Sequence, residues 1–186
     1  MKNKKLNSTL QLSQAECGLC CIRTILSYYS YDITVPELRK IKEPGRDGLG
    51  LKQIKSLLSV FNISSEVLKI KDLRAFQIVD LPAIAFWKGY HFVCVEKVNE
   101  NNVIIMDPSI GRIKISKKEF DENFDSYLII SKPNKNFKSR NTKFWSKWKK
   151  RHIWPPNLFN IYKTWDFEYY FSFYYFIYTD NHSNIN

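Results

Sequence analysis

A cysteine, Cys17, stands where an apolar, amphipathic run begins, in the stretch Gln11-Leu-Ser-Gln-Ala-Glu-Cys17-Gly18. The first backbone N–H groups of a helix are unpaired and carry partial positive charge, so a thiolate at that end is stabilised. A thiolate is a nucleophile, and the neighbouring Gly18 would leave room for the backbone of a bound peptide. The position of Cys17 therefore indicates nucleophilic chemistry at a helix start.

A histidine and an aspartate that could complete such a site come much later in the chain. His91 begins the strand-like run Tyr90-His91-Phe92-Val93-Cys94-Val95, and Asp107 follows sixteen residues after it. A cysteine protease needs a thiolate, a histidine that holds the proton, and a third group that orients the imidazole. If a short turn pairs the two strands, His91 and Asp107 lie at one end of a sheet, and Cys17 can lie over that end.

Donors for an oxyanion are the remaining part of such a site, and each is worth about 2.7 to 4 kcal/mol. The backbone N–H of Cys17 is one candidate donor. The side-chain amide of Gln11 or of Gln14 is a second, and the residues alone leave the choice between the two glutamines open.

The elements that would position these residues fall into two groups. Apolar residues at the 3.6-residue period predict a helix over 17–29, with Ser13 and Glu16 as a capping box, and two further helices over 34–38 and 51–61. Short β-like runs follow, at 65–70, 83–87, 91–98, 103–106, 112–115 and 127–131, with hairpin turns at 99–102 and 108–111. The sequence therefore predicts an α+β fold with N-terminal helices packed on an antiparallel sheet.

The other cysteines, Cys20, Cys21 and Cys94, are interpreted as buried structural thiols. The alternative is a zinc site, since Cys17-x-x-Cys20 and His91-x-x-Cys94 supply three thiols and an imidazole. Strand alternation argues against it, because His91 would point with Val93 and Val95 while Cys94 points the other way. The N-terminus lacks a signal-peptide pattern, so the thiols are expected to be reduced and cytoplasmic.

The composition changes near residue 134. Residues 135–186 carry nine Lys and Arg against three Asp and Glu, and 17 of the 29 aromatic residues. We therefore predict a domain over 1–134 and a basic, aromatic-rich tail over 135–186. The segment 138–151 suits anionic lipid headgroups, and without a nucleic-acid-binding module we expect no nucleic-acid partner.

A set of residues in a fixed order resembles the double-glycine leader peptidase domain of bacteriocin-exporting ABC transporters, a papain-like cysteine protease. The resemblance runs from about Leu10 to Ser131. It is carried by Gln11, Glu16-Cys17-Gly18, Cys21, Tyr29, Gly50-Leu51, Pro82-Ala-Ile-Ala-Phe-Trp87, His91-Phe92-Val93 and Asp107-Pro108.

This resemblance implies a papain-like fold and a role for each site residue. It implies that Cys17 is the nucleophile, His91 the general base and acid, Asp107 the orienting group, and Gln11 the oxyanion donor. It implies no cofactor and no metal. Two departures from the family pattern, Glu16 in place of Asp and Tyr90 in place of Asn, leave the reacting groups in place.

The resemblance also implies a substrate and partners. The substrates would be bacteriocin-type or signalling precursor peptides, cut after a double glycine, with apolar leader residues in a groove that we place between Leu49 and Phe61 and around Trp87. The partners would be the membrane and ATPase domains of an ABC transporter, at the inner face of the cell membrane. No phosphate-binding loop or long apolar run occurs here, so the tail is interpreted as a linker or a truncated transporter remnant. The alternative function is a leader-binding module that does not cleave.

Overall fold

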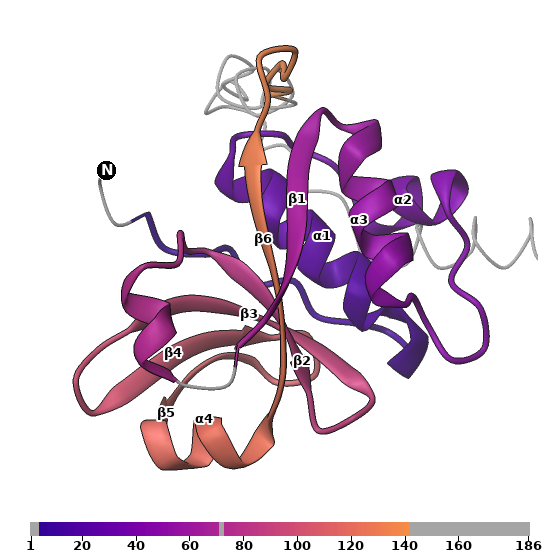
Figure 1. Cartoon of the computed structure of the whole chain (residues 1–186). Helices are drawn as coiled ribbons and strands as arrows, with labels where there is room; N and C mark the ends of the chain where they lie inside the picture. The colour runs from indigo at the N-terminus through magenta and orange to yellow at the C-terminus, as the bar shows by residue number, and fades with distance from the viewer. Residues whose placement is uncertain (1–3, 71–72, 142–186) are drawn as a thin grey trace, which may run out of the picture. The chain divides into compact units, whose positions relative to one another are not determined.

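The computed structural model describes residues 4–70 and 73–141 of the chain. In this part the chain forms a six-stranded antiparallel sheet in the order β1-β6-β2-β3-β4-β5, with helices packed on both faces (Figure 1). The strands are β1 (Ile63–Lys69), β2 (Ala83–Trp87), β3 (His91–Val98), β4 (Asn102–Asp107), β5 (Gly111–Ser116) and β6 (Phe124–Pro133). The helices are α1 (Cys17–Tyr28), α2 (Val35–Ile41), α3 (Leu51–Val60) and α4 (Lys117–Asn123), with short 3-10 turns η1 (Gln14–Glu16) and η2 (Leu73–Gln77).

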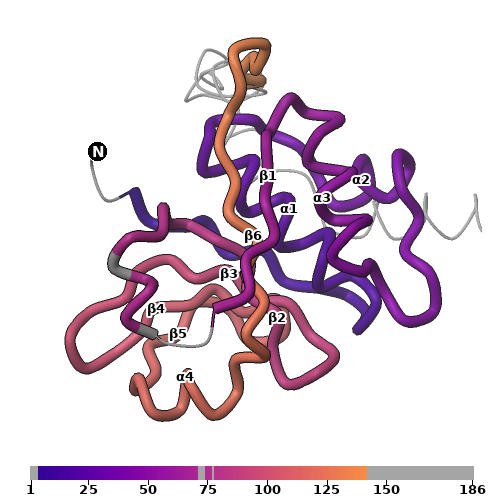
Figure 2. The backbone as a smooth tube through the Cα atoms, in the orientation of Figure 1, coloured from indigo at the N-terminus to yellow at the C-terminus, as the bar shows by residue number. Residues whose placement is uncertain are grey.

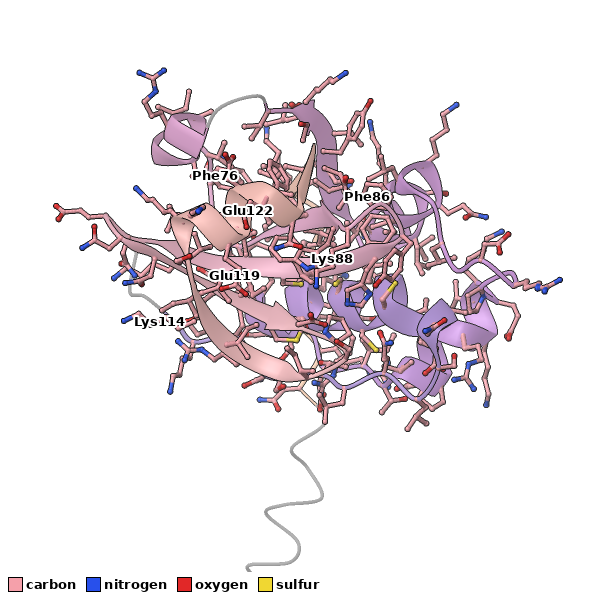
Figure 3. The ribbon with its side chains drawn as sticks, turned by 90° about the horizontal axis from the view of Figure 1, so that it is seen from below. Phe76, Phe86, Lys88, Lys114, Glu119 and Glu122 are labelled. Atoms are coloured by element: carbon pink, nitrogen blue, oxygen red, sulfur yellow. The ribbon has the colours of Figure 1, made fainter. Side chains whose placement is uncertain are left out.

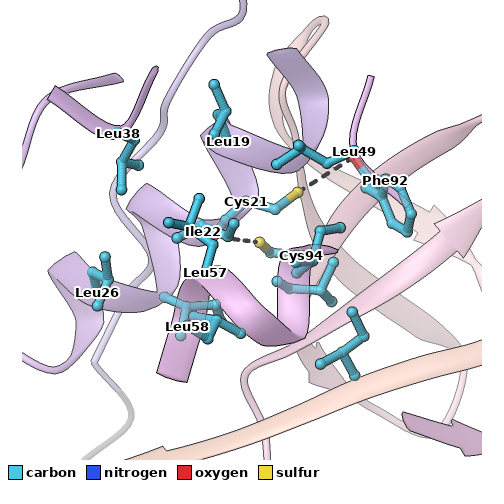
Figure 4. Close-up of a cluster of buried hydrophobic side chains, with 14 of the residues drawn as sticks. Leu19, Cys21, Ile22, Leu26, Leu38, Leu49, Leu57, Leu58, Phe92 and Cys94 are labelled. Atoms are coloured by element: carbon cyan, nitrogen blue, oxygen red, sulfur yellow. Dashed lines mark hydrogen bonds between the residues drawn. The ribbon is translucent and has the colours of Figure 1, made fainter. Parts of the chain in front are cut away.

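The three N-terminal helices gather on one side of the sheet, as the chain trace in Figure 2 shows. Helix α1 packs on β3 and α3 packs on β1. Between them lies a core of aliphatic side chains and thiols, including Leu19, Ile22, Leu58, Cys21 and Cys94 (Figure 4). This layer confirms the prediction that the nucleophile helix packs on the sheet.

The opposite face of the sheet is covered by η2 and α4. We call its core the aromatic core, because a cluster of rings around Phe120 lies among its aliphatic side chains. Phe120 of α4 is fully buried, and its ring lies 5.6 Å from Phe76, 5.3 Å from Trp87 and 5.3 Å from Phe124. Figure 3 looks onto this face, with Phe76 beside α4. Neither α4 nor η2 was predicted from the sequence, because each is too short to show a helical period.

The central strands β2 and β3 are buried on both faces, and their side chains alternate between the two cores. Phe92 and Cys94 belong to the helix-side core, whereas Val93 and Val95 belong to the aromatic core. This confirms the predicted alternation along β3. The six predicted strands and three predicted helices are all present, with bounds that differ by a few residues.

The predicted capping box between Ser13 and Glu16 is wrong. Ser13 makes no side-chain capping bond, and the carboxylate of Glu16 accepts the N–H of Leu12 instead, at 2.9 Å. The physical reason is the 3-10 turn η1. It directs the Glu16 side chain to the N–H of Leu12, one residue before Ser13, and within reach of Arg39 on α2.

After β6 the described chain continues along the helical layer. Phe137 packs against the rings of Tyr29 and Tyr31, at 6.4 and 6.1 Å. Arg140 pairs with Glu37 of α2 at 2.7 Å, and its carbonyl accepts a hydrogen bond from the Asp32 N–H at 2.7 Å. The domain boundary after residue 134 stays a prediction. Most of the proposed lipid-binding segment, from residue 142 on, lies outside the described residues.

None of the helices within residues 4–70 and 73–141 has the length and apolar character needed to cross a bilayer.

Candidate active site

Cys17 is the first residue of α1, and only 3% of its surface is exposed. The N-cap residue, Glu16, makes no side-chain hydrogen bond to the first turn. The N–H groups at the start of α1 therefore have no carboxylate cap competing with an anion beside Cys17.

Gly18 has a different role from the predicted one. A Cβ at this position would lie 3.2 Å from Cβ of Leu49 and 3.3 Å from Cδ1 of Ile54. The glycine therefore allows α1 to approach α3 and the loop before it, and it faces the core. The prediction that Gly18 leaves room for a peptide backbone is wrong.

His91 and Asp107 lie at one end of the sheet, at the start of β3 and the end of β4. The ring nitrogen Nε2 of His91 lies 2.8 Å from Oδ1 of Asp107, and both residues are buried. The thiol of Cys17 interacts with the imidazole closely enough to raise the pKa of His91. Because Nε2 faces Asp107, Nδ1 is the nitrogen left for Cys17. The structure thus brings the three residues into one line.

The electrostatics of this line favour a charged imidazole. Burial lowers the pKa of His91, but hydrogen bonds to Asp107 and Cys17, together with their negative charges, raise it to about 9. Burial opposes ionisation of Asp107, yet hydrogen bonds from His91 and Ser109 hold its pKa below the usual value. The arrangement therefore suits an imidazolium held between a carboxylate and a thiolate.

Ser109 is a site residue that the sequence analysis missed. Its backbone N–H and its hydroxyl both donate to Oδ1 of Asp107, at 2.8 and 2.7 Å. The same oxygen faces His91. The sequence signal was available, because an aspartate commonly accepts a hydrogen bond from the residue two positions later in a turn.

Gln11 stands beside this line, and its backbone N–H donates to the carbonyl of Pro108 at 2.8 Å. Its side-chain oxygen Oε1 is buried and has no hydrogen-bond partner among the described residues. The Gln11 side chain is therefore not held in place through that oxygen. Gln14 is exposed at the start of η1.

A cleft of about 330 Å³ opens at this point of the molecule. It is lined by residues of the N-terminal segment, the loop before α3 and the ends of the central strands: Gln11, Gln14, Ala15, Arg46, Asp47, Tyr90, His91 and Ser109. His91 and Gln11 thus line the same space, as a base and an oxyanion donor of acyl transfer must.

The remaining cysteines are fully buried and belong to the core. Burial raises the pKa of Cys20 to about 12, and burial also raises the pKa of Cys21 well above its usual value. Cys21 donates to the carbonyl of Phe92 at 3.4 Å, and Cys94 donates to the carbonyl of Cys21 at 3.6 Å (Figure 4). These thiols are therefore poor nucleophiles in the folded protein.

The zinc alternative finds no support in the described part of the chain. There, no group of three or more His, Cys, Asp or Glu side chains is arranged to hold a metal ion. Cys94 lies in the helix-side core, where its thiol bonds to the Cys21 carbonyl, while His91 is engaged with Asp107.

The leader groove was predicted around two places, and one of them is wrong. Trp87 is buried, with its ring against Phe120, so it lines no surface groove. The other region holds a cavity of about 250 Å³ between the end of α2 and α3. Its lining includes Ile41 and Val60, both about half exposed.

Comparison with known proteins identifies relatives over this same region. The sequence model of the peptidase C39 family matches residues 5–136. A lacticin-481/lactococcin-DR transport/processing ATP-binding protein of Lactococcus lactis subsp. lactis is 32% identical over 132 residues, which are 69% of this chain and 19% of the relative. A pediocin PA-1 transport/processing ATP-binding protein of Pediococcus acidilactici is 30% identical over 138 residues, 70% of this chain and 19% of that protein. The chain thus spans about a fifth of the length of these relatives.

Solved structures show the same fold. A double glycine motif protease from an AMS/PCAT transporter, in complex with the leader peptide, matches with a TM-score of 0.67 at 24% identity, over 70% of this chain and 93% of the other. The peptidase domain of Streptococcus ComA, a bi-functional ABC transporter of a quorum sensing pathway, matches with a TM-score of 0.65 at 18% identity, over 70% and 100%. The predicted papain-like α+β fold is confirmed. By the extent of the family match and the identity to its relatives, the chain belongs to the peptidase C39 family of cysteine peptidases.

Proposed function

We propose that this domain is a cysteine endopeptidase that removes the leader of a small precursor peptide by cutting after a double glycine. The observation that carries the proposal is that His91, which contacts Asp107 and interacts with Cys17, lines one cleft together with Gln11. Family membership supports the reaction class, and the names of the relatives support a substrate that is processed and transported.

In the first half of the reaction, the Cys17 thiolate attacks the carbonyl carbon of the second glycine. The oxyanion that forms accepts hydrogen bonds from the Gln11 amide and from the Cys17 backbone N–H. His91 then gives its Nδ1 proton to the leaving nitrogen of the mature peptide, and the leader stays on Cys17 as a thioester.

In the second half, His91 takes a proton from water, and the resulting hydroxide attacks the thioester. The leader leaves with a free carboxylate, and the Cys17 thiolate and the protonated His91 are restored. Throughout, Asp107 holds Nε2 and so keeps Nδ1 directed at the reacting atoms, which is the role of the third residue in such sites.

The leader itself would lie between the cleft and the groove at α2 and α3. The loop before α3 flanks the nucleophile, since Gly48 packs on the carbonyl of Ala15, and Leu49 packs on Gly18. Helix α3 leads away from there to Val60, about 15 Å along at 1.5 Å per residue. A helical leader can therefore place its apolar side chains in the groove with Ile41, Leu57 and Val60 while its glycines reach Cys17.

Separate transporter domains would supply the energy for export. The relatives are named as ATP-binding transport proteins, and this chain corresponds to 19% of their length. We propose that the domain works beside membrane and ATPase domains, at the cytoplasmic face of the cell membrane. The four free thiols suit a reducing compartment, and contact of the basic tail with anionic lipid is part of this proposal.

The test is a cleavage assay under reducing conditions with a synthetic precursor that ends its leader in Gly-Gly. Mass spectrometry should show cleavage directly after the second glycine by the wild type, and Cys17→Ala should abolish it while still binding the leader. A matched precursor with valine in place of the second glycine should stay intact. Binding of the leader without cleavage by the wild type would instead establish the leader-binding module. Cleavage by Cys17→Ala would remove the nucleophile assignment.

A further inference from the structure

Glu16 is the most deeply buried charged side chain in the described part of the chain, with 2% of its surface exposed. It directly precedes Cys17 and occupies the N-cap position of α1, yet it makes no hydrogen bond to the first turn of that helix. A buried carboxylate is strongly unfavourable unless other groups compensate it. The contacts of Glu16 therefore indicate what the carboxylate does at this position.

Each oxygen of the Glu16 carboxylate has one partner. Oε1 pairs with Nη2 of Arg39, which reaches across from α2 and is about one-third exposed. Oε2 accepts the backbone N–H of Leu12 at 2.9 Å. The carboxylate thus joins α2 to the segment that precedes the nucleophile.

The bond to Leu12 bears directly on Gln11, because Leu12 N–H is the amide that follows it. The N–H of Gln11 itself is held by the Pro108 carbonyl at 2.8 Å. Glu16 is adjacent to Cys17, and Pro108 is adjacent to Asp107. The two hydrogen bonds therefore tie the Gln11 backbone to the helix of the nucleophile and to the turn of the orienting carboxylate.

Side-chain packing on either side of Gln11 is weak. The side chains of Leu10 and Leu12 are 60% and 92% exposed. Apolar contacts at these two positions therefore contribute little to the conformation of the segment, and its hydrogen bonds determine where the Gln11 side chain points.

Arg39 also compensates the buried charge of Glu16. Its guanidinium pairs with Oε1 of the carboxylate, so the buried carboxylate is not an uncompensated charge. The pair can therefore hold the segment from a buried position.

We propose that Glu16 and Arg39 are positioning residues of the peptidase site. Arg39 fixes the Glu16 carboxylate, the carboxylate holds Leu12 N–H, and the Gln11 amide is thereby kept against the oxyanion. This rests on the proposed function, in which Gln11 stabilises that oxyanion.

A double-mutant cycle with Gln11 tests the proposal on the whole 186-residue chain. Glu16→Gln keeps an oxygen for Leu12 N–H but cannot hold Arg39 by charge, so the segment loses its fixed position. A displacement of 1 Å can cost about 100-fold in rate, so kcat should fall by about 10- to 100-fold with KM within about twofold. In the Gln11→Ala background, measured by single turnover with excess enzyme, Glu16→Gln should lower the rate by no more than about threefold, because the group that it positions is gone.

Two further variants separate positioning from support of the fold. Glu37→Gln removes an ion pair of the same helix α2, with Arg140, and should lower stability but leave kcat unchanged. Arg39→Lys keeps the charge but loses the planar fork of the guanidinium, so it should give a smaller loss of kcat with the same dependence on Gln11. Far-UV circular dichroism and the melting temperature report the folded state of each variant.

The outcomes distinguish this proposal from the one on which it rests. An equal loss from Glu16→Gln with and without Gln11, or an equal loss of kcat in Glu37→Gln, would overturn the positioning role while the cleavage reaction stood. Unchanged kcat in Glu16→Gln would also overturn it. Absence of cleavage by the wild type would refute the proposed function and this inference together.

Discussion

The two faces of the sheet are covered by elements of different size. The helix-side face holds α1–α3 over aliphatic side chains, rings and three thiols, with a glycine that brings α1 against α3. The opposite face, under η2 and α4, holds a cluster of rings around Phe120. Small side chains allow α1 to approach closely, whereas rings fill volume beneath two short elements.

This difference separates chemistry from support. The candidate catalytic groups lie at the edge of the helix-side layer, where α1 begins beside the ends of β3 and β4. The sheet therefore separates the two layers: the candidate catalytic groups lie at the edge of one, and the other supports the strands that carry His91 and Asp107.

The largest expected effect is on stability, from a truncation on the aromatic face. Phe120→Ala removes a fully buried ring that contacts three others, and such changes cost about 3 to 5 kcal/mol of unfolding free energy. We expect kcat at low temperature, where the variant stays folded, to remain within about twofold of wild type. Urea denaturation and the cleavage assay measure the two quantities.

Cys17→Ala is the matched variant on the helix-side face. In contrast to Phe120→Ala, it should abolish cleavage and change the stability only slightly. A large loss of kcat in folded Phe120→Ala would break the comparison, because it would show that the aromatic face also determines the geometry of the site.

The helix-side face was predictable from sequence, and much of the aromatic face was not. The helical period of apolar residues over 17–29 and the strand alternation over 91–98 each extend over enough residues to be recognised. Helix α4 has seven residues, begins with two lysines and carries a single buried side chain, Phe120. An element with one inward residue has no periodicity to detect, so its packing depends on tertiary contacts.

The site shows the same limit at the level of single residues. Cys17, His91 and Asp107 were recognised because their types and order match one chemistry, whereas Gln11 was chosen over Gln14 by the family resemblance. The structure places Gln11 and His91 in one cleft, with Asp107 and Cys17 next to His91, and their catalytic roles stay predictions. Arg39 was not recognised, because its partner Glu16 lies 23 positions away on another element. Gly18 was predicted to leave room for a substrate. Its actual neighbours, Leu49 and Ile54, are more than 30 positions later in the chain, so no sequence pattern indicated that contact.

A substitution at Asp107 should change both rate and pH dependence. Asp107→Asn removes the carboxylate that holds Nε2, and loss of such an orienting group should lower kcat by about 100-fold, or roughly 2.7 kcal/mol. The pKa of His91, about 9 in the folded protein, should fall, because its main charged partner is gone. The alkaline limb of kcat/KM, near pH 9 in the wild type, should move to lower pH.

Titration of His91 should also make the stability of the folded protein depend on pH. The folded pKa of His91 lies above the unfolded value of about 6.5, so its contribution is fully present below pH 6.5 and is lost as the pH rises through 9. Urea denaturation across this window should show falling stability in the wild type and a shallower slope in Asp107→Asn. Identical slopes in the two proteins would contradict the assigned pair.

The smallest expected effect comes from Ser109, whose hydroxyl supports Asp107 without touching the imidazole. Ser109→Ala removes one donor at 2.7 Å but leaves the backbone N–H at 2.8 Å on the same oxygen, so we expect about a fivefold loss of kcat, or about 1 kcal/mol. Ser109→Thr keeps a hydroxyl and should recover most of the rate.

Ser116→Ala provides the matched hydroxyl deletion beside the aromatic face. Ser116 caps α4 by accepting Glu119 N–H at 3.0 Å, so its removal should cost about 1 kcal/mol of stability with kcat unchanged. If Ser109→Ala lost stability alone, as Ser116→Ala should, its hydroxyl would only stabilise the turn after Asp107. A loss of rate without that loss of stability would place Ser109 with the residues that orient the imidazole, because its hydroxyl donates to Oδ1 of Asp107, the oxygen that also holds Nε2 of His91.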